Sequence, residues 1–195
     1  MEFNLVRKML QPAPGGTLLD VGCGTGYFTR RLADECSLRV VGLDPNTEWL
    51  AFARLHDVGI EVYCGGRAEQ LPFADTSFDY AISITALCFV DDARSALREL
   101  LRVSRRRFVI GLLNRHSLLF RQKGRSGGTG AYHGAHWHSV GEIGTLLQGL
   151  PVTNASIFSA VFLPGGSLFA RALEAVLPGS FRVGAFIAVA GDVRR

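Results

Sequence analysis

Short apolar runs alternate with amphipathic stretches along the first 113 residues of the chain. Runs rich in Val, Ile and Leu predict strands that are buried on both faces of a sheet. They cover residues 17–21, 38–44, 60–66, 78–87 and 107–113. Between them, residues 27–35 and 45–57 have the spacing of amphipathic helices. Strands that alternate with helices predict a mostly parallel sheet covered on both faces, in a three-layer, doubly wound α/β fold.

Three predicted helices begin at residues suited to capping. Asn46 precedes one helix, and Asp91 or Asp92 precedes the next. Ser139 and Glu142 have the spacing of a capping box, which predicts a third helix after them. The second helix has one apolar face, formed by Ala93, Ala96, Leu97, Leu100 and Leu101.

The last third of the chain differs in pattern. The apolar runs 152–163 and 183–191 predict two closing strands, and residues 165–180 between them predict a helical insert. Because no full crossover follows the final strand, we expect the last two strands to pair antiparallel.

Length and composition limit the class of protein. The 195 residues, 48% of them hydrophobic, suit one domain with a sizeable core, covering residues 1–195. The first ten residues lack the apolar core of a secretory signal, and prolines interrupt the charge-free stretch 143–170, so we expect no membrane span. The four cysteines form no C-x-x-C pair. Free thiols of this kind are typical of the reducing cytoplasm, so we expect a cytoplasmic protein.

A glycine-rich loop follows the first predicted strand, with Gly22, Gly24 and Gly26 at alternate positions. In doubly wound folds, ligands bind at the carboxyl ends of the strands, where this loop lies. Tyr27 stands where a dinucleotide fingerprint requires a third glycine, which disfavours a dehydrogenase. Asp44 ends the next strand and is suited to holding ribose hydroxyls.

Four segments together resemble the class I S-adenosylmethionine-dependent methyltransferases, in the group called methyltransferase type 11. They are LLDVGCGTGYFTRRLA, VVGLDPNTEWLAFAR, GGRAEQLPFADTSFDYAISITAL and ALRELLRVSRRRFVIGLL, and the resemblance covers roughly residues 15–113. The resemblance implies a Rossmann-like sheet of seven strands with an antiparallel last strand. It also implies S-adenosylmethionine as cofactor, held by residues 15–113, with residues 114–150 on the acceptor side and 151–195 forming the closing strands.

The resemblance assigns roles to individual residues. Asp20 is expected beneath the glycine loop, Asp44 at the ribose diol and Tyr27 as a cap on the cofactor. Many relatives have Asp where Arg67 stands, and because Arg has no acceptor, backbone groups are expected to contact the adenine there. The residues implied to bind the cofactor are Asp20, Gly22, Cys23, Gly24, Gly26, Tyr27, Asp44, Pro45, Arg67, Ala68, Glu69, Ile84 and Thr85.

Methyl transfer is an in-line displacement on the sulfonium methyl by an O, N, S or C nucleophile, and alignment is its main requirement. A base is needed only for a protonated acceptor, so the sequence names no acceptor atom. The candidates for acid–base work are His116, Tyr132, His133 and His136. No Cys or acid accompanies the H-x-x-H-x-H pattern at 133–138, so we expect no metal site.

The leading hypothesis is a methyltransferase for a small-molecule acceptor, and two alternatives stay open. The basic stretch 115–125 suits an RNA or protein substrate, although residues 84–87 lack the Asn-Pro-Pro-Tyr-like motif of many nucleic-acid enzymes. A non-catalytic, cofactor-binding domain is the other. Relatives usually have a helical segment before the position of Glu2, so we expect an open acceptor pocket, or one covered by a partner or second subunit. Trp49, on a predicted helix, is expected in the core.

Overall fold

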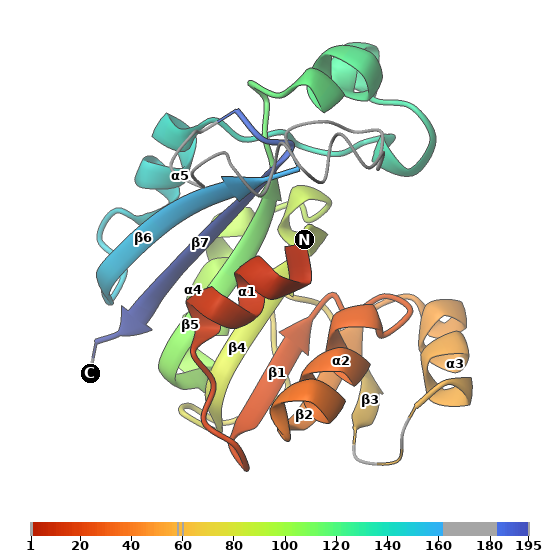
Figure 1. Cartoon of the computed structure of the whole chain (residues 1–195), viewed down its shortest axis with the longest axis vertical. Helices are drawn as coiled ribbons and strands as arrows, with labels where there is room; N and C mark the ends of the chain where they lie inside the picture. The colour runs from red at the N-terminus through yellow and green to blue at the C-terminus, as the bar shows by residue number, and fades with distance from the viewer. Residues whose placement is uncertain (1, 58, 60, 162–182, 195) are drawn as a thin grey trace.

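Seven strands form one sheet in the order β3-β2-β1-β4-β5-β7-β6 (Figure 1). The computed structural model describes residues 2–57, 59, 61–161 and 183–194. The strands are β1 Thr17–Val21, β2 Arg39–Asp44, β3 Val62–Gly65, β4 Phe78–Ile84, β5 Ser104–Leu113, β6 Val152–Ala160 and β7 Phe186–Val193. The helices are α1 Glu2–Leu10, α2 Tyr27–Cys36, α3 Thr47–Leu55, α4 Ala93–Val103 and α5 Val140–Leu147, with short turns η1 Ala86–Cys88, η2 Phe120–Gly124, η3 Arg125–Gly127 and η4 Gly130–Tyr132.

The sheet confirms the doubly wound topology. β1 lies parallel to β2 and β4, with Leu19 opposite Val41 on one side and Ala81 on the other. β7 is antiparallel to both β5 and β6. The predicted antiparallel pairing of the last two strands is therefore confirmed, whereas the predicted insert at 165–180 lies outside the described residues.

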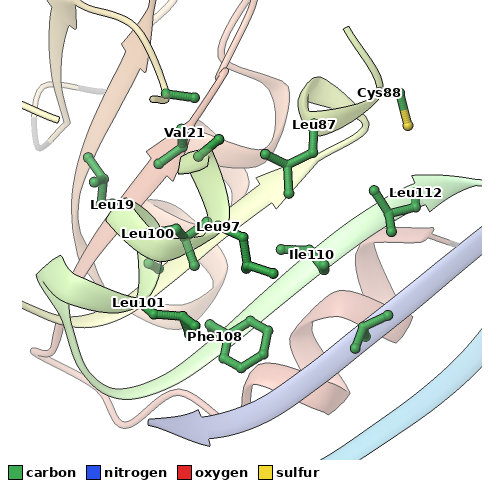
Figure 2. Close-up of a cluster of buried hydrophobic side chains, with 14 of the residues drawn as sticks. Leu19, Val21, Leu87, Cys88, Leu97, Leu100, Leu101, Phe108, Ile110 and Leu112 are labelled. Carbon is green, nitrogen blue, oxygen red and sulfur yellow. The ribbon is translucent and has the colours of Figure 1, made fainter. Parts of the chain in front are cut away.

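Alternation along the strands separates two hydrophobic cores. On one face, Leu19 of β1 and Ile110 of β5 meet Leu97 and Leu100 of α4 (Figure 2). On the other face, side chains such as Leu18 of β1 belong to a second cluster that includes residues of α1 and α2. Each fully buried Leu contributes about 1.5–3 kcal/mol to folding, so both faces of the sheet must be covered.

The helix starts agree with the sequence. The Asn46 side chain accepts the backbone N–H groups of Glu48 and Trp49, and Asp92 caps α4. Ser139 and Glu142 form the predicted capping box of α5. No helix was predicted over residues 2–10, where α1 lies and buries Phe3, Val6, Met9 and Leu10.

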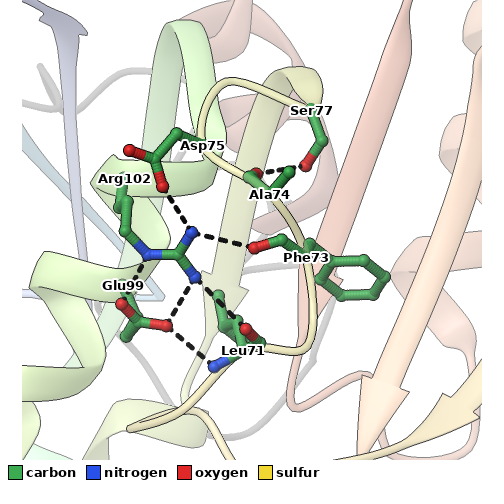
Figure 3. A network of polar contacts seen from close by, with 7 residues as sticks. All are labelled: Leu71, Phe73, Ala74, Asp75, Ser77, Glu99 and Arg102. Atoms are coloured by element: carbon green, nitrogen blue, oxygen red, sulfur yellow. Dashed lines mark hydrogen bonds and ion pairs between the residues drawn. The ribbon is translucent and has the colours of Figure 1, made fainter.

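The arginines from 102 to 107 are held by ion pairs within the fold. Arg102 donates to Glu99, to Asp75 and to the carbonyl oxygens of Leu71 and Phe73 (Figure 3). These bonds fix the connection between β3 and β4 against α4, and they lower the pKa of Glu99. The remaining arginines of this stretch also pair with acids, namely Arg105 and Arg106 with Asp79, and Arg107 with Asp192.

Among the described residues, no helix has the length and apolar character that crossing a membrane requires.

Candidate functional site

The glycine loop after β1 is held tightly between neighbouring elements. Gly22, Gly24 and Gly26 have φ values of 75°, 54° and 78°, a region that disfavours other residues. The N–H groups of Gly22 and Cys23 both donate to the carbonyl oxygen of Leu43, at 2.7 and 3.0 Å. A Cβ added to Gly22 would lie 2.1 Å from the Cβ of Ala86, so only glycine fits there.

Asp44 connects the end of β2 to this loop. Its side chain is buried, with 4% exposed. One carboxylate oxygen accepts the N–H of Gly24 at 2.8 Å, and the other accepts the N–H of Asn46 at 2.8 Å. Each carboxylate oxygen has a second acceptor position, so Asp44 retains capacity for ligand hydroxyl groups.

Asp20 lies at the end of β1, behind the loop. It is buried, and one of its oxygens accepts the hydroxyl of Thr29 at 2.7 Å. Burial raises the pKa of Asp20 to about 7; the bond from Thr29 opposes the shift and the charge of Asp44 adds to it. The protonation of Asp20 is therefore sensitive to any charge that enters the site near neutral pH.

A pocket of about 730 Å³ opens beside the loop, at the carboxyl ends of the parallel strands. This volume lies in the range that drug-sized ligands and cofactors occupy, roughly 300–1,000 Å³. Every residue predicted to bind the cofactor lines the pocket, except Asp20 and Gly26. A Cβ on Gly26 would instead meet the hydroxyl of Tyr63 at 2.7 Å, beneath the loop.

Aromatic side chains also line the pocket, among them Trp49 and Phe89, which the sequence did not single out for this site, and Tyr27, which it did. The expectation of a core position for Trp49 is wrong, because this side chain is 51% exposed at the pocket wall. Tyr27 is equally exposed, and Phe89, after η1, is 49% exposed. Position 49 lies in the first turn of α3, shortly after Asp44, and this spacing could have indicated that both residues line one pocket.

Two acids of the pocket were also missed, Glu2 of α1 and Asp91 after η1. One guanidinium nitrogen of Arg67 donates hydrogen bonds to the carboxylates of Asp91 and Glu69, each at 3.3 Å. Arg67 thus bridges the segments that follow β3 and β4, and these acids raise its pKa. The contact joins residues that are distant in sequence, so no local pattern indicates it.

The candidates for acid–base chemistry lie outside the described pocket lining. His116, Tyr132, His133 and His136 are not among the lining residues, although Ala131 is. The N–H of His136 donates to the carbonyl oxygen of Cys88 at 2.7 Å, which attaches this segment to η1. Their part in any reaction stays a prediction.

The histidine stretch contains one buried ring. His138 is 4% exposed, and its Nε2 has no hydrogen-bond partner. Burial and the neighbouring His136 lower the pKa of His138 to about 4, so the ring is neutral at pH 7. Across the described residues, no three His, Cys, Asp or Glu side chains are grouped closely enough to hold a metal ion.

Comparison with known proteins finds sequence matches over about half of the chain. Residues 19–109 match the family described as Methyltransferase domain. The 24-methylenesterol C-methyltransferase 2 of Arabidopsis thaliana is 40% identical over 100 residues, which cover 49% of this chain and 28% of that protein. An O-methyltransferase of Pyrenophora dematioidea is 34% identical over 105 residues, covering 51% of this chain and 39% of that protein. The chain therefore spans less than half the length of these relatives.

The fold has a wider match. A solved structure described as a SAM-dependent methyltransferase, from Thermotoga maritima, aligns with a TM-score of 0.74 at 24% identity. The alignment covers 98% of this chain and 88% of that one. The likeness of fold therefore extends past residue 109, through the closing strands β6 and β7.

Proposed function

We propose, from the premise that the chain carries a class I S-adenosylmethionine-dependent methyltransferase domain, that it binds S-adenosylmethionine and methylates a small-molecule acceptor. The observation that supports this most directly is the pocket of about 730 Å³ that contains both the glycine loop and Asp44. Residues 1–195 act in this proposal as one domain, with residues 114–150 on the acceptor side.

The residues present fit such a cofactor. The loop has no side chain at Gly22 or Gly24, so a ligand can approach its backbone closely. Asp44 is fixed by two backbone N–H groups and keeps acceptor positions for a ribose diol. Arg67 points its guanidinium toward Glu69 and Asp91, so the backbone near Ala68 is left to contact the adenine.

S-adenosylmethionine, when bound, supplies a methyl group on a positively charged sulfur for displacement by an O, N, S or C nucleophile. The chain's own part is to orient and to exclude water. Ile84 ends β4 at the pocket, and Thr85 follows it with a φ of 63°, which is costly for a β-branched residue. Strain of this kind is typical of functional sites, and we assign Thr85 to the methionine end of the cofactor.

Calorimetry with S-adenosylmethionine and S-adenosylhomocysteine tests the proposal. We expect both to bind, and we expect Asp44→Ala to weaken binding at least tenfold, since hydrogen bonds to a charged group contribute about 1.5–3 kcal/mol. Asp34→Asn is the matched control, because Asp34 is an exposed acid of α2 outside the pocket lining. Absence of binding by the intact chain would refute the proposal.

A second subunit or partner over the acceptor side remains part of the proposal. The first turn of α1 reaches the pocket through Glu2, so one wall is supplied by the chain itself. Light scattering with and without cofactor gives the oligomeric state, and a monomer that methylates its acceptor would contradict a required second subunit.

A further inference from the structure

One aromatic wall of the pocket is bonded to an arginine that is not among the described residues of the lining. Tyr27 and Phe28 begin α2, and both line the pocket. Arg31 follows Tyr27 by four residues, which places both side chains on one face of the helix. A guanidinium nitrogen of Arg31 donates to the hydroxyl of Tyr27 at 2.8 Å. The half-exposed ring of Tyr27 is therefore tied to the helix at its hydroxyl.

Arg31 is itself held on two further sides. Its guanidinium carbon lies 3.7 Å from the ring centre of Phe3, a buried residue of α1, which is the geometry of a cation–π contact. Its Nε donates to the carboxylate of Glu35, one turn further along α2, at 2.6 Å. With these contacts in place the guanidinium has little freedom to move, so the bond to Tyr27 is made from a fixed point.

A half-exposed tyrosine at the edge of a cavity has a choice of rotamers unless its neighbours fix it. Phe28 meets the ring of Tyr27 edge to face, with ring centres 5.3 Å apart. The bond from Arg31 adds a second restraint, at the hydroxyl. A ligand that must order a loose side chain loses affinity, by about 2–10-fold for each one, whereas a side chain that is already ordered adds no such cost.

We infer that Arg31 is a positioning residue of the cofactor site, which through its bond to the Tyr27 hydroxyl holds that ring as a wall of the pocket before the cofactor binds. This rests on the proposed function, because the ligand is the proposed cofactor. Arg31 acts through Tyr27 and itself contacts no ligand. A direct effect of its charge would have the opposite sign, because S-adenosylmethionine carries a net positive charge and a nearby cation repels it.

Calorimetry with S-adenosylmethionine tests the inference on the full chain, on Arg31→Met, on Tyr27→Phe and on the variant with both changes. Arg31→Met keeps a long apolar side chain without the donor, and Tyr27→Phe keeps the ring without the hydroxyl. We expect each single change to weaken binding about 3–10-fold. The double variant should bind no more than about twofold more weakly than the weaker single variant, because both changes break the same bond. Losses that multiply, or an Arg31→Met affinity equal to that of the parent, overturn the inference.

A matched control removes another arginine beside the same acid. Arg7 of α1 pairs with Glu35 at 3.7 Å and is not among the described residues of the lining. Arg7→Met makes the same chemical change as Arg31→Met, and we expect the affinity to stay within about twofold of the parent, because solvent screens exposed charges. An equal loss in both variants would mean that the charge of this surface is responsible and not the bond to Tyr27, which overturns the inference.

Urea unfolding of the same variants separates positioning from a purely structural role. Arg31→Met also removes the contacts with Phe3 and Glu35, so we expect it to lower the free energy of unfolding both alone and combined with Tyr27→Phe. That loss with an unchanged affinity would show a structural role only and overturns the inference. If Arg31→Met does not fold, Tyr27→Phe decides, because it breaks the bond and keeps the ring: weaker binding supports the inference and unchanged binding overturns it. If the parent chain binds no S-adenosylmethionine, the proposed function itself fails.

Discussion

Replacing Gly22 by alanine tests how strictly the loop geometry is enforced. The change acts in two separable ways. A φ of 75° costs a residue with a side chain about 1–2 kcal/mol. The new Cβ would also lie 2.1 Å from the Cβ of Ala86, and relieving such an overlap costs about 1–3 kcal/mol. We therefore expect Gly22→Ala to lower the free energy of unfolding by about 2–5 kcal/mol.

A second substitution separates the two contributions. Ala86→Gly removes the obstructing Cβ and costs about 0.5–1 kcal/mol by itself, through the flexibility of glycine. In the double variant the overlap is absent, and only the backbone strain and the cost of Ala86→Gly itself remain. The double variant should therefore be about 1–3 kcal/mol more stable than the sum of the two single effects predicts. Urea unfolding of the four proteins, followed by tryptophan fluorescence, gives these values.

Cofactor binding provides an independent measurement of the same change. If the loop relieves the overlap by moving, Gly22→Ala should reduce the free energy of S-adenosylhomocysteine binding more than it reduces the free energy of unfolding. Adding Ala86→Gly should then restore part of the lost affinity. Additive effects of the two substitutions on both stability and binding would refute the idea that the loop is wedged against Ala86.

Two further predictions concern charged groups. The raised pKa of Asp20, about 7 against an ordinary value near 3.8, means that the folded protein keeps a proton that the unfolded chain releases. The free energy of unfolding should therefore fall as the pH rises from about 4 to about 7, and Asp20→Asn should remove that fall. If the free energy of unfolding, measured with urea, changes equally with pH in the parent and in Asp20→Asn, the burial argument is contradicted. Arg102→Leu should cost about 2–4 kcal/mol in the same assay, because it removes the charged donor to the carbonyl oxygens of Leu71 and Phe73 and leaves Glu99 with only the N–H of Leu71. Conversely, Arg102→Lys should recover only part of the loss, since one ammonium cannot reproduce the forked contacts, and full recovery would show that charge alone matters.

The sequence predicts the strands and helices of the fold because their patterns are local. Strand β1 is a run of buried residues, and α4 has one apolar stripe with a cap at Asp92. The glycine loop and Asp44 are predictable in the same way, because each directly follows a strand whose carboxyl end defines the ligand edge. Residues of this kind are identified by neighbours a few positions away.

The parts that escape prediction depend on contacts between distant segments. Glu2 and Asp91 reach the pocket because α1 and the segment after η1 fold over the same strand ends. Trp49 has the spacing of a helix residue, and only the position of α3 beside the loop decides that it lines a cavity and not the core. The arginines at 105 and 106 look like a solvated charge run, although the fold pairs both with Asp79.

The way the glycine loop is held has a consequence for the order of folding. The motif stands near the front of the chain, yet its shape depends on the carbonyl oxygen of Leu43 and on the methyl group of Ala86. The loop is therefore held in its folded shape only when β2 and β4 have paired with β1, and such non-local pairings are slow to form because closing the intervening chain costs entropy. The proposed cofactor site is thus complete only when these distant segments have come together, although Gly22, Gly24 and Gly26 precede both β2 and β4 in the sequence.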